Sequence, residues 1–203
     1  MGSTNRTATY TSGSGSTQLV FRYTIQAGET DSDGISIGAN ALALNSGSIR
    51  DAALNNAILS HSAMSANTSY KVDTTAPSLS QVTAITTPTK DTTPSYAFSS
   101  NEAGTIAYGG SCSSGTTSAS SVTNTISFNT LSDNSYSDCT VTVTDSAGNA
   151  SNALSVNTFV VDATAPTLNS VAISSASGVQ NRLLNSGDVA SVTATFSESV
   201  VVN

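Results

Sequence analysis

The residues best suited to chemistry in this 203-residue sequence are acidic side chains in predicted turns. Asp73 lies in a short segment that ends in proline, Glu102 follows a strand-like run, and Asp145 opens the pattern Asp-Ser-Ala-Gly-Asn that ends at Asn149. Calcium binds roughly six to eight oxygen ligands, including carboxylates and backbone carbonyls. These residues therefore predict a calcium site if the fold brings their loops together. The alternative is that they are ordinary solvated turn residues that cap their own backbone.

No motif in the sequence indicates catalysis. The single histidine, His61, lies in a polar stretch, and the sequence offers no recognisable partners for a hydrolase triad or a zinc site around it. Dinucleotide-binding, phosphate-binding and HExxH motifs are all absent from the sequence. Asp31 and Asp33 are paired carboxylates, but they share one Asp-Ser-Asp-Gly turn, which lacks the third ligand and the distal Glu of a full calcium loop. We therefore expect a hairpin turn there and a protein that is not an enzyme.

The charge balance excludes two classes of partner. Thirteen acidic residues against six basic ones give a formal net charge of −7. Nucleic acids and anionic membrane surfaces require clustered Lys and Arg, so neither is an expected partner. No apolar stretch reaches the roughly 18 residues of a membrane span, and the first residues do not resemble a signal peptide. We interpret the chain as an interior segment of a longer protein.

A repeated linker organises the sequence. Val72-Asp73-Thr74-Thr75-Ala76-Pro77 returns as Val161-Asp162-Ala163-Thr164-Ala165-Pro166, and Asp162 follows Asp73 by 89 residues. This period is the size of a small β-sandwich, and the proline makes each linker a stiff joint. The linkers at 73–77 and 162–166 therefore divide the chain into a C-terminal part of a repeat (1–72), a complete repeat (78–161) and an N-terminal part of a further repeat (167–203).

Hydrophobic alternation predicts an all-β fold. Apolar and polar residues alternate with period two along Leu19–Ile25, Thr140–Thr144 and Val192–Phe196, which is typical of antiparallel strands. In the complete repeat we expect strands near residues 79–86, 95–99, 105–109, 122–129, 137–144 and 155–161. This number and spacing of strands favours an immunoglobulin-like sandwich. The only helical element expected is a single turn near residues 39–44.

Such a sandwich would position the acidic residues. The incoming linker, the loop after the second strand and the loop between the last two strands meet at one end, which would bring Asp73, Glu102, Asp145 and Asn149 together. At the next joint Asp162 and Glu198 would converge, because Phe98-Ser99-Ser100-Asn101-Glu102 is similar to Phe196-Ser197-Glu198. Asp51 begins the corresponding Asp-x-Ala-x-Asn loop of the first part.

The sequence resembles the bacterial immunoglobulin-like repeats of giant surface adhesins, the biofilm-associated and RTX-type proteins. The resemblance rests on the VDTTAP joints, on TTPSYAFSSNEAGTIAYGGSC and on CTVTVTDSAGNAS, with FRYTIQAGETDSDGI similar to the second half of a sister repeat. It implies extracellular extender repeats that carry an adhesive tip away from the cell, with joints that calcium often rigidifies. Leu54 stands where the family pattern usually has Gly, which predicts a loop of different shape.

Cys112 and Cys139 follow the third strand and open the penultimate strand of the predicted sandwich. These strands are neighbours in this topology, and an exported protein permits a disulfide between them. The alternative is a pair of free thiols.

The leading interpretation is therefore a structural one, in which the partners are neighbouring repeats of the same polypeptide. The alternatives are a module that binds a glycan or a host protein, and an accessory domain of a secreted enzyme. Residues 167–203 would expose a strand edge. Either further strands of a longer chain cover that edge, or the two partial repeats of different molecules pair head to tail.

Overall fold

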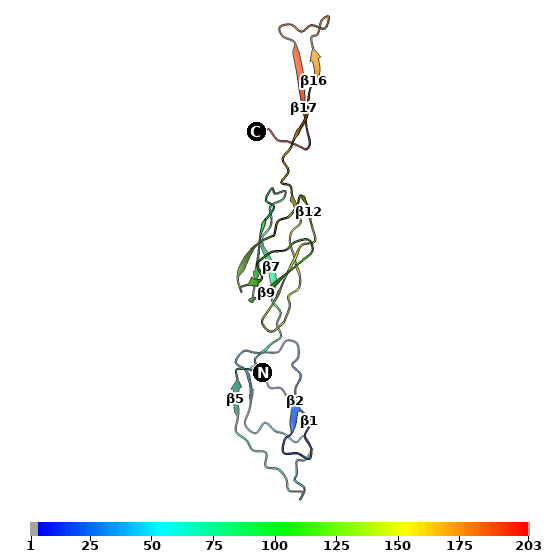
Figure 1. The fold of residues 1–203 in the computed structure, drawn as a ribbon. Coiled ribbons are helices and arrows are strands. Elements are labelled where there is room, and N and C mark those ends of the chain that lie inside the picture. Colours follow the sequence, from blue (N-terminus) through cyan, green and yellow to red (C-terminus); the bar gives the residue numbers. More distant parts are fainter. Residues whose placement is uncertain (1–3, 203) are drawn as a thin grey trace.

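A computed structural model describes residues 4–202, and all of its regular structure is β. No helix occurs among these residues, which confirms the all-β class. The helical turn expected near residues 39–44 is wrong, because Ala39 and Asn40 form a simple turn in which Asn40 has a φ of 51°. Figure 1 shows an elongated molecule whose three parts follow one another in sequence order. Along residues 4–202, no helix with the length and apolarity to cross a bilayer is found.

Residues 78–161, here called the middle domain, contain two antiparallel sheets with the orders β10-β9-β13-β14 and β11-β8-β7, and a separate pair β12-β15. The strands are β7 (Leu79–Thr83), β8 (Ser95–Ser100), β9 (Gly104–Gly109), β10 (Ser118–Ala119), β11 (Thr123–Ser127), β12 (Asn134–Tyr136), β13 (Thr140–Thr144), β14 (Leu154–Ser155) and β15 (Phe159–Val161). Each of the six predicted strands overlaps at least one of these, and the strand predicted at 155–161 overlaps both β14 and β15. The short strands β10 and β12 were not predicted.

Alternation along the strands separates the core of the middle domain from its surface. In β13, Val141 and Val143 are fully buried, whereas the three threonines that alternate with them are partly exposed. Phe159 stacks between Phe128 and Tyr136, with ring centroids 6.4 and 5.2 Å away. The same cluster contains Tyr96 and Phe98 of β8, so the two sheets and the pair β12-β15 share one hydrophobic core.

The predicted disulfide is present and closes this core. Cys112 and Cys139 are bonded, with Cα atoms 5.3 Å apart, and both residues are buried. The bond joins the chain after β9 to the chain before β13, and these strands already pair through Gly109 and Thr140.

The first part, residues 4–72, forms three small two-stranded pairings, one of which continues into the linker. Its strands are β1 (Thr9–Ser12), β2 (Val20–Arg22), β3 (Thr30–Asp31), β4 (Ile35–Ile37), β5 (Met64–Asn67) and β6 (Val72–Asp73), paired as β1-β2, β3-β6 and β4-β5. Among the hydrophobic residues of 4–72, Val72 is the only one that is buried. The strand predicted over Leu19–Ile25 is present as β2, but its apolar side chains remain exposed.

The C-terminal part is a two-stranded ribbon of β16 (Leu168–Ser177) and β17 (Val189–Phe196). Directly opposed residues lie on the same face of an antiparallel pair. One face therefore carries the apolar pairs Leu168–Phe196, Val171–Ala194 and Ile173–Val192. All of these residues are exposed, Ile173 to 75%. A two-stranded ribbon is marginal in water on its own, so its stability requires that this face be covered.

Candidate metal centre at the first joint

Asp73 is held by the first part of the chain. It is the last residue of β6 and pairs with Thr30 of β3. Its Oδ1 accepts a hydrogen bond of 3.0 Å from the Thr75 N–H, which turns the backbone into the linker at 73–77, the first joint. This bond is the backbone cap expected of an ordinary turn aspartate. The Asp73 side chain is exposed beside the loops of the middle domain.

Asp145 is fixed by the loop that it opens. Its Oδ1 accepts the N–H groups of Ala147 and Asn149, at 2.8 and 2.9 Å, and its Oδ2 accepts the side-chain amide of Asn149 at 2.8 Å. Gly148 has a φ of 93°, a conformation that suits glycine. These bonds, the Asn149 side-chain amide foremost, lower the pKa of Asp145, so the carboxylate is charged at neutral pH.

Glu102 follows β8 in the turn towards β9. The turn is set by a reciprocal pair of bonds between Ser78 and Asn101, and by the Ser100 hydroxyl, which donates to the Glu102 carbonyl. The Glu102 side chain is half-buried and leaves this turn in the direction of the first joint.

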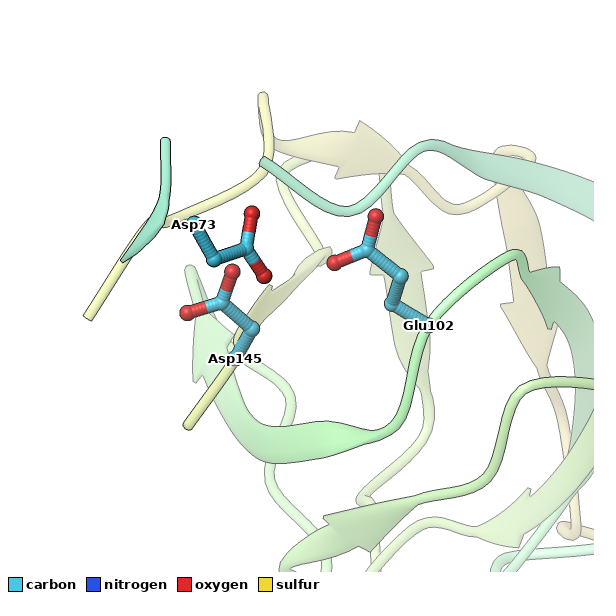
Figure 2. Close-up of side chains that lie close together, drawn as sticks. All are labelled: Asp73, Glu102 and Asp145. Atoms are coloured by element: carbon cyan, nitrogen blue, oxygen red, sulfur yellow. The ribbon is translucent and has the colours of Figure 1, made fainter. Parts of the chain in front are cut away.

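Figure 2 shows the carboxyl groups of Asp73, Glu102 and Asp145 directed at a common space. One carboxylate oxygen from each of the three residues lies within 4.8 Å of the others. The Asn149 side-chain amide also reaches across the joint and donates to the Asp73 carbonyl at 3.2 Å. The four residues grouped by sequence therefore meet at one end of the middle domain.

Three carboxylates at this separation repel one another unless a cation is shared between them. Each carboxylate offers about four lone-pair sites, so the backbone caps formed by Asp73 and Asp145 leave other lone pairs for an ion. Calcium tolerates irregular arrangements of carboxylate, carbonyl and water oxygens, whereas magnesium requires a near-octahedral shell. The three carboxylates therefore form a donor set that could hold a metal ion.

Asp51 is not part of this cluster. It lies in the long hairpin between β4 and β5, just beyond the bridge between Arg50 and Asn56. Its loop repeats the bonds of the Asp145 loop: Asp51 accepts the N–H groups of Ala53 and Asn55 and the Asn55 side-chain amide. The Asn55 side chain is the main cause of a lowered Asp51 pKa.

The loop change expected from Leu54 is therefore wrong. Leu54 adopts a φ of 69°, in the left-handed region that Gly148 occupies in the middle domain. The hydrogen bonds of Asp51 keep the loop in the same shape in spite of the unfavourable residue at position 54.

Asp162 opens the linker at 162–166, the second joint, and Glu198 follows β17. Thr167 and Ser197 exchange two hydrogen bonds there, as Ser78 and Asn101 do at the first joint. Glu198 follows Ser197 as Glu102 follows Asn101, so the two glutamates occupy equivalent places. Within residues 4–202, the group of three converging acids occurs at the first joint alone.

The other acidic and basic candidates have structural partners. Asp31 is buried, and its Oδ1 accepts the Gly34 N–H at 2.9 Å, as in a hairpin turn. The His61 Nε2 accepts the Ala41 N–H at 2.9 Å, and the Nδ1 lies 2.8 Å from the Ser62 carbonyl. His61 therefore links the two arms of the hairpin between β4 and β5.

Sequence reasoning missed two carboxylates, Glu29 and Asp133. Glu29 is buried and accepts bonds from the Gln26 N–H, the Tyr23 hydroxyl and Arg6. Asp133 binds the second linker, as described below. Neither residue belongs to a repeated motif, so only the folded structure brings their partners to them.

Comparison with known proteins adds no further evidence on this site, because no protein-family profile, no curated protein and no solved structure matches the chain.

Proposed function

We propose that this chain is a set of non-catalytic extender repeats from a bacterial surface or secreted adhesin, with calcium bound at the joints between repeats. One observation carries the proposal. A carboxylate of the linker, Asp73, meets two carboxylates of the next domain, Glu102 and Asp145, within 4.8 Å. An ion shared by these groups would fix the angle between consecutive repeats and so set the reach of a longer protein.

The disulfide and the elongated shape support an extracellular, load-bearing role. Cys112 and Cys139 are bonded, and disulfides persist in oxidising compartments such as the cell exterior. Extracellular calcium modules bind with dissociation constants of about 10⁻⁴ to 10⁻³ M, which suits a half-exposed site built from three carboxylates. The partners in this proposal are the neighbouring repeats of the same polypeptide.

Thermal unfolding with calcium and with chelator tests the proposal. At about 10 mM calcium, a dissociation constant in the extracellular range stabilises the site-bearing domain by about 1.4 to 2.7 kcal/mol. For a domain of this size that free energy raises the unfolding midpoint by about 6 to 20 °C. Calorimetric titration should give one ion per chain.

Two matched variants locate the effect. Asp145→Asn should abolish the calcium response, because it removes one ligand charge from the cluster. Asp51→Asn changes the same loop motif at a place without converging acids, so its calcium response should equal that of the wild type. An identical midpoint for the wild type in calcium and in chelator would reject the metal site.

Two kinds of segment could cover the apolar face of the ribbon β16–β17: further strands of a longer chain, or the first part of another molecule. We propose the first, since neighbouring repeats of one polypeptide supply such strands without a second chain. Light scattering over a range of concentrations tests this choice. Mass that grows with concentration would instead support head-to-tail pairing of the partial repeats.

A further inference from the structure

The first linker is bound to the part of the chain that precedes it. Asp73 is still within the β3-β6 pairing. The next residue, Thr74, donates its hydroxyl to the Glu29 carbonyl at 3.0 Å and accepts the Gly28 N–H at 2.8 Å. The Thr74 hydroxyl thus continues the pairing by one residue after the strand has ended.

The second linker is also bound backwards, by a different group. The Asp162 N–H donates to the Thr89 carbonyl at 2.9 Å. The Asp133 Oδ1 then accepts the Ala163 N–H at 2.8 Å, and its Oδ2 accepts the Thr164 hydroxyl. Asp133 immediately precedes β12, the strand that pairs with β15, so its carboxylate also extends a strand pairing beyond its last residue.

The sequence difference between the linkers matches this difference in chemistry. Thr74 of the first linker is replaced by Ala163 in the second. Alanine has no hydroxyl to bind a backbone carbonyl. In the second linker the Asp133 carboxylate takes the Ala163 N–H and the hydroxyl of the following threonine instead. Each linker is therefore hydrogen-bonded to the part of the chain that precedes it, but through different residues.

Apart from the bond that the Asn149 side-chain amide donates to the Asp73 carbonyl, the forward attachment begins only after the alanine of each linker. Pro77 is buried at the start of the middle domain, whereas Thr75 and Ala76 are exposed. Ala76 and Pro77 also line an open pocket of about 340 Å³ between the linker and the chain at 150–154, which leaves room for movement. At the second joint, Ala165 and Pro166 are both exposed.

We propose that each linker moves as part of the repeat before it, so that the hinge of the joint lies at Thr75–Ala76 and at Ala165–Pro166. Asp133 is the positioning residue that attaches the second linker. This attachment needs no metal ion. The role of the hinge in setting the angle between repeats rests on the proposed extender function. An ion at the first joint would bridge the hinge, because Asp73 moves with the first part while Glu102 and Asp145 move with the middle domain.

Nuclear magnetic resonance of the ¹⁵N-labelled full chain in excess chelator tests the hinge. In the wild type, the heteronuclear NOE of Ala163 and Thr164 should equal that of β15 and should fall at Ala165. In Asp133→Ala the values for Ala163 and Thr164 should fall to that of Ala165, and hydrogen exchange of the Ala163 amide should accelerate about tenfold.

Two further variants complete the design. Thr164→Val removes one of the two bonds, so the Ala163 amide should keep its slow exchange while Thr164 becomes more mobile. Asp91→Ala is the matched control, because the Asp91 side chain caps Thr93 in its own turn and its loss keeps the backbone bond of Asp91 to Thr89, so the linker should be unchanged. The proposal is overturned if Ala163 is already mobile in the wild type, or if Asp133→Ala leaves Ala163 and Thr164 as rigid as before.

The outcome is independent of the calcium proposal. All of these measurements are made in chelator, and calcium is then added to the wild type as a separate step. Failure of calcium to alter the amide signals of residues 73–76 would reject the metal site and leave the attachment by Asp133 as measured.

Discussion

Loss of the disulfide should destabilise the middle domain more than the rest of the chain. Cys112 and Cys139 are separated by 27 residues, and closing a loop of that length removes conformational entropy worth about 3 to 4 kcal/mol from the unfolded chain. The strands next to both cysteines are already paired, so the folded state should survive reduction. For a domain of this size the expected fall in the unfolding midpoint is about 12 to 30 °C.

Differential scanning calorimetry of oxidised protein, reduced protein and a Cys112→Ala/Cys139→Ala variant measures this effect. The reduced wild type keeps both sulfur atoms in the core, so its midpoint reports the crosslink alone. The double variant also loses packed volume and should melt at a still lower temperature. Near-ultraviolet circular dichroism assigns the transition to the middle domain through its stacked aromatic rings. A reduced protein that melts within about 3 °C of the oxidised one would refute the entropy argument.

Two more predictions concern residues 4–72 and the loop of the middle domain that begins at Asp145. Leu54→Gly should stabilise the protein by about 0.5 to 1 kcal/mol, because relief of the left-handed conformation at position 54 exceeds the added freedom of the unfolded chain. Gly148→Ala should instead destabilise the corresponding loop of the middle domain. Equal unfolding midpoints for Leu54→Gly and the wild type would contradict the first expectation. The Gln26 N–H, followed by the Tyr23 hydroxyl, lowers the Glu29 pKa from 4.5 to about 2, so its stabilisation is complete above pH 4.5 and is lost as the pH falls through 2. An acid titration followed by tyrosine fluorescence should show this loss in the wild type, and Glu29→Gln should flatten that pH dependence.

The strands of the middle domain could be predicted because their patterns are local. Thr140–Thr144 alternates without a break, and the structure buries its valines and leaves its threonines partly exposed. The strands β10 and β12 have two and three residues, too few for a period of two to stand out from loop sequence. Their existence depends on the partner strands β9 and β15.

The similarity of the Phe98 and Phe196 segments does not extend to the register of the strands. Both phenylalanines lie in the strand that precedes a glutamate. In the structure, Leu79 pairs with Ser100 whereas Leu168 pairs with Phe196, so Phe196 occupies the place of Ser100. The hydrogen bonds at the start of each hairpin set the register, and these bonds cannot be read from apolar residues. The two glutamates nevertheless align, because each follows the residue that closes the hairpin.

The Asp-x-Ala-x-Asn loop occurs twice in the chain, and only one of its copies lies at the candidate metal site. The loops that begin at Asp51 and Asp145 form the same side-chain bonds, and in both the pKa of the aspartate is lowered by the following asparagine. The loop by itself is therefore a self-capping turn and does not imply an ion. What distinguishes Asp145 is the arrival of Asp73 from the preceding part of the chain, together with Glu102 from a neighbouring turn. Under the proposed function, the unit that would bind calcium is thus the joint between two parts of the chain and not the single loop, so occupancy of the site would report that the two parts are correctly docked.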